Sequence, residues 1–232
     1  MRPVLALVIA GLAGTGRAPL AAAGPVDADL TVRVYQTAGL SSAIERRALE
    51  EAARVLRPAL VAVRWRLCSG PNPAPPCDRP LGHAELSVRI VRRGVVRRDA
   101  TNALGTALVA PGRGGVLATV YVDQIEELSM AARTDAAVLL GRATAHEIGH
   151  LLMRTSGHAP CGLMRATWTE QEVRRNHPLD WMFTAGDVVA MHRFWAQPDL
   201  PAGRPHRVAD TSPSAASISF NRSSGSLRRP AA

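Results

Sequence analysis

The sequence contains no lysine and few aromatic residues, and both shortages narrow what the chain can bind. All 28 basic residues are arginines, and they give a formal net charge of +9 without forming a basic run interleaved with aromatic residues. Aromatic residues make up 4% of the 232-residue chain, too few for a platform on which the bases of a nucleic acid would stack. We therefore expect no nucleic-acid partner.

Long apolar runs are also absent, because no segment has the roughly 20 apolar residues that a membrane-spanning helix needs. Residues 3–14 are apolar but shorter than this, and the small residues 21–23 that follow suit a cleavage site. This pattern predicts a signal peptide over residues 1–23. We therefore expect an extracytoplasmic protein, either secreted or periplasmic, without stable membrane insertion. The remaining length suits one domain, over residues 24–197, and we expect a monomer.

Cysteine is scarce as well, with three residues in the chain. Cys68 and Cys77 flank a proline-rich loop that a disulfide would close in an oxidising compartment. Cys161 is left over. It is a candidate metal ligand, a reactive thiol or a small buried side chain.

The hydrophobic pattern predicts an α+β domain followed by a disordered tail. Alternation predicts strands over residues 30–35, 60–67, 85–92, 106–110 and 115–122. Helical spacing and capping residues predict helices over residues 42–57, about 136–153, 169–175 and 184–195, the first with a capping box from Ser42 to Glu45. Residues 198–232 are rich in Pro, Ser and Arg without periodicity, which predicts disorder.

The predicted helix over about 136–153 carries the motif His146-Glu-Ile-Gly-His150. Two imidazoles four residues apart lie on the same side of a helix, roughly one turn from each other, so both can bind one ion. Zinc accepts such ligands, and a catalytic zinc site uses three protein ligands and one water. Glu147, next to the first histidine, is then placed to act as a general base on that water.

Spacing alone leaves two alternatives for the third ligand, His158 and Glu170. His158 would lie about 12 Å beyond His150 on a continuous helix, so the chain must reverse, and residues 156–157 (Ser-Gly) suit such a reversal. Glu170, 20 residues after His150, is the alternative ligand, as in gluzincin-like sites with two histidines and a glutamate. Cys161 suits a catalytic zinc less well, because a thiolate reduces the Lewis acidity of the metal.

Residues 146–164 resemble the active-site segment of the metzincin metallopeptidases, especially the matrixin-like ones. The resemblance implies that His158 is the third ligand and that Met164 forms the methionine turn beneath the metal, although Met164 would also suit an ordinary core position. The usual metzincin spacing would place the third histidine at position 156, so this chain is two residues longer there. The family fold implies a twisted, mixed five-stranded sheet, two long helices and a short C-terminal subdomain that ends in a helix.

These observations predict a secreted zinc-dependent metalloendopeptidase that acts on a peptide or protein substrate. Glu147 would be the general base, and His146, His150 and His158 would hold Zn²⁺. The alternative is a secreted zinc-binding or interaction module that keeps the site without turnover. An exported interaction domain with an incidental histidine pair is a third possibility, and the metal content of the protein separates it from the other two.

Overall fold

The computed structural model describes residues 28–69, 77–82, 84–93, 102–110, 114–195 and 214–221. The elements are, in chain order, β1 (Ala28–Gln36), α1 (Ser42–Leu56), β2 (Val61–Leu67), β3 (Glu85–Val91), β4 (Gly105–Ala110), β5 (Gly114–Tyr121), α2 (Val122–Ala132), α3 (Ala136–Met153), β6 (Thr167–Thr169), α4 (Glu170–Arg175), α5 (Ala185–Trp195), β7 (Ser214–Ala216) and β8 (Ser219–Asn221). Two short 3-10 helices cover Arg57–Ala59 and Pro178–Trp181.

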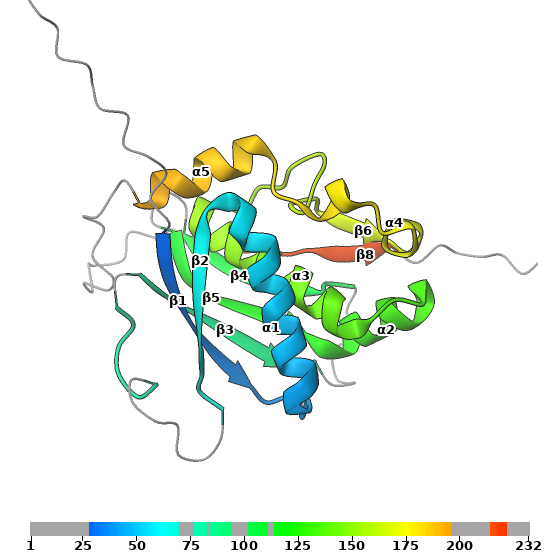
Figure 1. The fold of residues 1–232 in the computed structure, drawn as a ribbon, viewed down its shortest axis with the longest axis horizontal. Helices are drawn as coiled ribbons and strands as arrows, with labels where there is room; N and C mark the ends of the chain where they lie inside the picture. Colours follow the sequence, from blue (N-terminus) through cyan, green and yellow to red (C-terminus); the bar gives the residue numbers. More distant parts are fainter. Residues whose placement is uncertain are drawn as a thin grey trace, which may run out of the picture.

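Six strands form one mixed sheet in the order β2-β1-β3-β5-β4-β7 (Figure 1). Strands β2, β1, β3 and β5 are parallel, whereas β4 is antiparallel to both of its neighbours, β5 and β7. The prediction of a mixed sheet is therefore right, but the prediction of five strands is wrong. The sixth strand, β7, comes from a segment that the sequence pattern did not identify as a strand.

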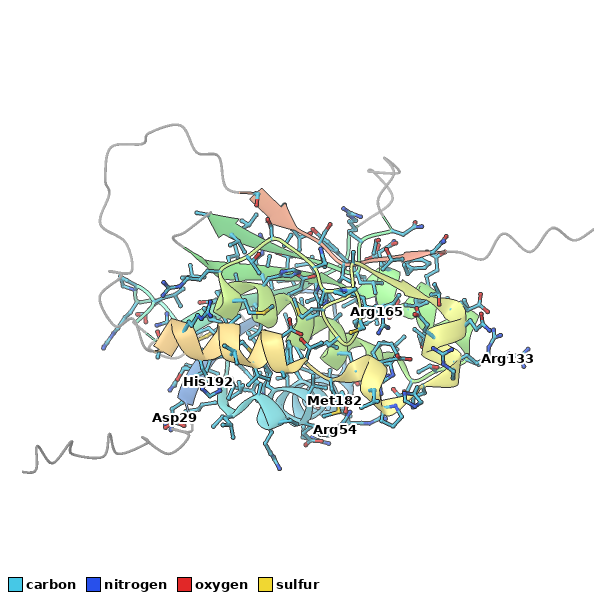
Figure 2. The ribbon with its side chains drawn as sticks, turned by 90° about the horizontal axis from the view of Figure 1, so that it is seen from above. Asp29, Arg54, Arg133, Arg165, Met182 and His192 are labelled. Atoms are coloured by element: carbon cyan, nitrogen blue, oxygen red, sulfur yellow. A yellow bond between two sulfur atoms is a disulfide. The ribbon has the colours of Figure 1, made fainter. Side chains whose placement is uncertain are left out.

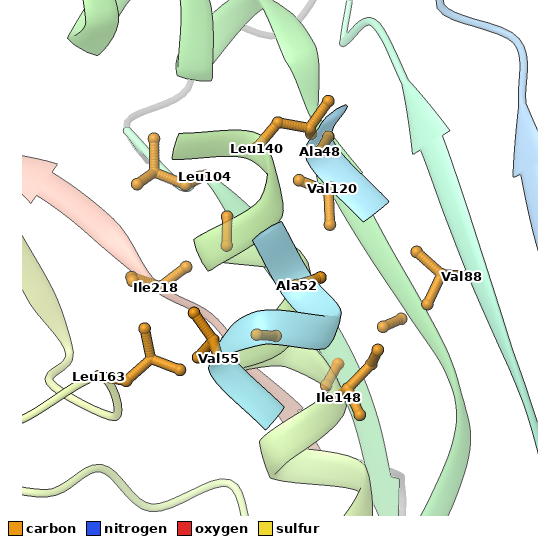
Figure 3. Packing of buried hydrophobic residues seen from close by; sticks show 14 of the residues in the cluster. Ala48, Ala52, Val55, Val88, Leu104, Val120, Leu140, Ile148, Leu163 and Ile218 are labelled. Atoms are coloured by element: carbon orange, nitrogen blue, oxygen red, sulfur yellow. The ribbon is translucent and has the colours of Figure 1, made fainter. Parts of the chain in front are cut away.

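The core lies between one face of the sheet and the helices α1 and α3, which cross that face (Figures 1 and 3). The strands alternate as expected when a single face is covered, since Leu30, Val32 and Val34 on β1 are buried. Helix α1 begins one residue earlier than the predicted capping box, because the side chain of Ser41 accepts a hydrogen bond from the backbone N–H of Ile44. Helix α3 is buried along most of its length and carries the histidine motif.

The chain returns to the sheet after α5, which corrects two predictions. Residues 198–232 were predicted to be disordered, but residues 214–221 contain β7, which pairs with β4, and β8, which pairs with β6. For the same reason the part of the chain after α3 does not end in a helix. Helix α2 was also missed, because its apolar residues directly follow strand β5 without a turn signal. The rest of the predicted tail and the predicted signal peptide over residues 1–23 lie outside the described residues.

Two other predictions concern the cysteines and the membrane. Cys68 and Cys77 form the predicted disulfide, with their Cα atoms 5.6 Å apart, while Cys161 is a free, exposed cysteine. Across the described parts of the chain, no helix has both the length and the apolar character needed to cross a membrane.

Candidate metal centre

Helix α3 places His146 and His150 side by side in the interior. Both residues are completely buried, and their Nε2 atoms are 3.0 Å apart. Two ligands of one tetrahedral zinc ion lie about 3.3 Å from each other when each bond is about 2.05 Å long. The two nitrogens therefore already point at a common position of the right size for one ion.

Backbone carbonyls fix the tautomer of both rings. The Nδ1 atom of His146 donates to the carbonyl oxygen of Leu163 at 2.8 Å, and the Nδ1 atom of His150 donates to that of Thr155 at 2.9 Å. A carbonyl oxygen only accepts, so the proton of each neutral ring lies on Nδ1 and the lone pair on Nε2 is free. Such hydrogen bonds orient metal-binding histidines and raise their basicity.

His158 joins the pair because the chain reverses directly after α3. Arg154, with a φ of 54°, ends the helix in the left-handed conformation, and its N–H and that of Thr155 return to carbonyls of the last turn. The His158 ring centroid lies 4.8 Å from that of His150 and 5.5 Å from that of His146. The predicted reversal is thus present, but it occurs at Arg154, and Gly157 does not have a positive φ.

The three histidines form a group whose ligand atoms all lie within 4.8 Å of one another. His158 is the least buried of the three residues, yet its Nε2 atom is buried and has no hydrogen-bond partner. A buried ring nitrogen without a partner loses the hydrogen bonds of water and gains nothing in exchange. A metal ion at the centre of the group would remove this cost.

Burial keeps the two inner histidines neutral at physiological pH. It lowers the pKa of His146 well below its usual value, and the neighbouring His150 lowers it further. Burial also lowers the pKa of His150 to about 4, with a further decrease from His158. Because the neutral ring is the form that binds a metal, no proton has to be removed from either ligand at pH 7.

Glu147 lies beside this group in a position prepared by strand β4. The residue is completely buried, and neither carboxylate oxygen has a hydrogen-bond partner. Burial raises the pKa of Glu147 well above its usual value, and the nearby backbone N–H of Ile218 opposes this rise without forming a hydrogen bond of normal geometry. The side chain packs against Gly105, where an added Cβ would lie 2.6 Å from Oε1 of Glu147. A buried carboxyl group one residue along the helix from His146 is placed to accept or donate a proton at the site.

We expect the substitution Gly105→Ala to destabilise the metal-free protein by about 1–3 kcal/mol, because the new methyl group must displace Glu147 from a packed interior. The matched control is Gly82→Ala, whose Cβ would be 3.6 Å from its nearest neighbours, an ordinary contact. Urea unfolding of both variants measures the difference. Equal stability of the two variants would show that Glu147 is not held against β4.

The turn that contains Met164 packs against helix α3 at the histidine motif. Leu163 supplies the carbonyl that orients His146, and the carbonyl of Met164 accepts from the N–H of Ala159 at 2.9 Å. The sulfur of Met164 lies so close to Gly149 that an added Cβ would be only 2.9 Å away. The glycine inside the motif therefore leaves the space that this turn fills.

The other ligands considered from the sequence lie outside the group. Glu170 begins helix α4 and forms an ion pair with Arg174. Cys161 is exposed and does not belong to the three-histidine group. Within the described residues, the structure thus brings His146, His150 and His158 together and leaves Glu170 apart.

The donor set suits zinc. Three neutral imidazoles are the ligand set of open, catalytic zinc sites, in which a fourth position remains for water. A glutamate that follows the first histidine of such a pair is the usual general base of zinc peptidases. The site therefore defines a candidate three-histidine zinc centre with an adjacent carboxyl group.

Comparisons with known proteins add little to this picture. No family model and no curated protein matches the sequence. Among solved structures, the chain is similar to archaemetzincin from Methanopyrus kandleri, with 16% sequence identity, a TM-score of 0.42, and coverage of 76% of this chain and 99% of that one. At this TM-score and sequence identity, the likeness does not indicate an activity.

Proposed function

We propose that this protein is a zinc-dependent metalloendopeptidase that hydrolyses peptide bonds. The observation that carries the proposal is the convergence of three buried imidazole nitrogens, two of them oriented by backbone carbonyls, beside the unpartnered carboxyl group of Glu147. His146, His150 and His158 would hold the metal. The hydrogen bonds to Leu163 and Thr155 support this assignment, because they keep the Nε2 lone pairs directed at one point.

Each residue then has a distinct role. When bound, zinc lowers the pKa of a water molecule to near 7 and polarises a carbonyl group. Glu147 takes the proton of the attacking water and returns it to the leaving amine. Its raised pKa suits this role, because a carboxyl group buried without a partner both takes up a proton readily and passes it on within a dry site. His146 and His150 hold no proton on Nε2, and all three histidines act only as ligands.

The contact of Met164 with Gly149, inside the histidine motif, supports the metzincin-like, matrixin-like interpretation of residues 146–164. The spacing of two extra residues before His158 is accommodated by the turn at Arg154 and Thr155. We further propose that the protein acts outside the cytoplasm, which the disulfide between Cys68 and Cys77 supports. A catalytically silent zinc-binding module is the second candidate, and the unpartnered Glu147 favours the peptidase, because a purely structural site does not need a buried carboxyl group there.

The third ligand is tested by comparing His158→Ala with Glu170→Gln. We expect His158→Ala to weaken zinc binding by at least about 100-fold, because two imidazoles alone leave a catalytic site one ligand short. Glu170→Gln should bind zinc like the wild type, since Glu170 lies in an ion pair with Arg174. Competition with a chromophoric chelator measures both affinities. The opposite ranking of the two variants would move the third ligand to Glu170.

A further inference from the structure

Residues 214–221 run between two flanking strands, β4 and β6. On one side, β7 pairs antiparallel with β4, so that Ala216 lies opposite Ala107. On the other side, β8 pairs parallel with β6, so that Ser219 lies opposite Thr167, and Figure 1 shows β8 beside β6. The same segment thus forms backbone hydrogen bonds with strands on both sides, β4 and β6, which are called the two walls below. A peptide that binds by strand addition pairs with a strand in the same way.

The pairing continues past the metal centre on the β4 side. The N–H of Leu104 donates to the carbonyl of Ile218 at 2.7 Å, and the N–H of Phe220 donates to the carbonyl of Asn102 at 3.0 Å. On the β6 side, the N–H of Ser219 donates to the carbonyl of Ala166 at 3.0 Å. The segment is therefore held in an extended conformation by both walls.

The two residues between β7 and β8 lie at the catalytic groups. Strand β4 brings the segment to Glu147, because the N–H of Leu104 donates to the carbonyl of Ile218 and the next residue, Gly105, packs against the Glu147 side chain. The backbone of Ser217 lies near His158. The peptide bond between Ser217 and Ile218 thus lies close both to a histidine of the group and to Glu147. A peptide about to be hydrolysed must lie near both groups, since its carbonyl must be polarised and its nitrogen must receive a proton.

We propose that residues 214–221 occupy the substrate-binding cleft in the orientation of a peptide substrate, with the Ser217–Ile218 bond at the catalytic centre. The inference rests on the proposed peptidase function. The segment closes the site against external peptides while it is bound. Hydrolysis of the bond breaks C–N, adds the hydroxyl of water to the carbonyl carbon of Ser217, and delivers a proton through Glu147 to the nitrogen of Ile218.

The side chains of this segment indicate which peptides the cleft accepts. Ile218, directly after the presented bond, is completely buried and belongs to the same hydrophobic cluster as Leu104 and Leu163 (Figure 3). The residues before the bond, 214–217, are Ser-Ala-Ala-Ser, and Ala216 is buried where a larger side chain would have to displace its neighbours. The substrate class is therefore an extended peptide with small residues before the cleaved bond and a branched aliphatic residue after it.

The first experiment releases the segment in the full-length protein. Ala216→Asp places a carboxylate at a buried position of β7, whereas the matched control Ala215→Asp places the same group at the neighbouring, exposed position. We expect Ala216→Asp to increase the rate at which a chelator removes zinc by at least about tenfold, and to lower KM for an added peptide. Ala215→Asp should change neither. A folded Ala216→Asp variant with wild-type zinc loss and wild-type KM would overturn the proposal.

The second experiment supplies the segment as a synthetic peptide, Ser-Ala-Ala-Ser-Ile-Ser-Phe-Asn. Added to zinc-loaded Ala216→Asp protein, it should be cut between the second serine and isoleucine, as mass spectrometry of the products shows. The same peptide with Asp in place of Ile should not be cut. Cleavage elsewhere, or no cleavage while the variant cuts an unrelated unfolded protein, would contradict the proposal.

The outcomes separate this inference from the function on which it rests. If none of the proteins binds zinc or cuts any substrate, the proposed function fails. If Ala216→Asp and the wild type cut an unfolded protein equally well and lose zinc at the same rate, the function stands and the substrate-like placement of residues 214–221 is wrong. If Ala216→Asp does not fold, the same measurements are made on Ile218→Gly, because this substitution removes a buried side chain of the segment without adding a charge.

Discussion

Replacing Glu147 with glutamine is expected to lower kcat/KM for an unfolded protein substrate by about 10²–10⁴-fold, the usual effect of losing a general base. Glutamine keeps the shape of the side chain and its packing against Gly105, but it neither takes up nor releases a proton. The metal ligands are unchanged, so zinc should remain stoichiometric. Zinc content by mass spectrometry and initial cleavage rates, measured on the same preparation, provide the test.

The matched control for this prediction is Glu45→Gln. Glu45 lies on α1, is also buried, and has a carboxyl oxygen without a hydrogen-bond partner, and burial raises its pKa as it does for Glu147. Its substitution should leave cleavage unchanged, because Glu45 is not part of the metal centre. Full activity of Glu147→Gln, with zinc bound, would remove Glu147 from the reaction.

Zinc is expected to stabilise the fold by about 4 kcal/mol when free zinc exceeds its dissociation constant 1,000-fold. The ion binds the folded state, in which three nitrogens converge, and gains little from an unfolded chain in which they are separated. It also satisfies the buried Nε2 atom of His158, which has no partner of its own. Urea unfolding with and without a chelator measures the difference in the free energy of unfolding.

Two variants make this measurement specific. His146→Ala removes a completely buried ligand and should abolish most of the stabilisation by zinc. His177→Ala removes an exposed histidine outside the three-histidine group and should retain it. Equal stabilisation of both variants by zinc would show that the metal binds somewhere other than on α3.

The local part of the site was predictable from the sequence because it depends on helical geometry. Four residues separate His146 from His150, and any regular helix places two such side chains on one side. The inclusion of His158 required a chain reversal, which was expected correctly but at the wrong residue. Arginine rarely adopts the left-handed conformation of Arg154, so no rule based on residue preference would have chosen it over Gly157.

The remainder of the site depends on pairing between distant segments, which local patterns do not reveal. Gly105 faces Glu147 only because β4 crosses α3, and nothing in the sequence near position 105 indicates this contact. The sequence predicts disorder over residues 198–232, which include 214–221, because Pro, Ser, Ala and Arg are abundant there without periodicity. One signal was present, since Ala216, Ile218 and Phe220 alternate with polar residues, as in a strand with one buried face.

The most direct test of the account is the X-ray absorption spectrum of the zinc-loaded protein, which reports the atoms bound to the metal. We predict three nitrogen ligands from imidazole and one oxygen from water, all at about 2.0–2.1 Å. His158→Ala should remove one imidazole from this set. A sulfur ligand at about 2.3 Å, or only two imidazoles in the wild type, would contradict the claim that His146, His150 and His158 form an open zinc site.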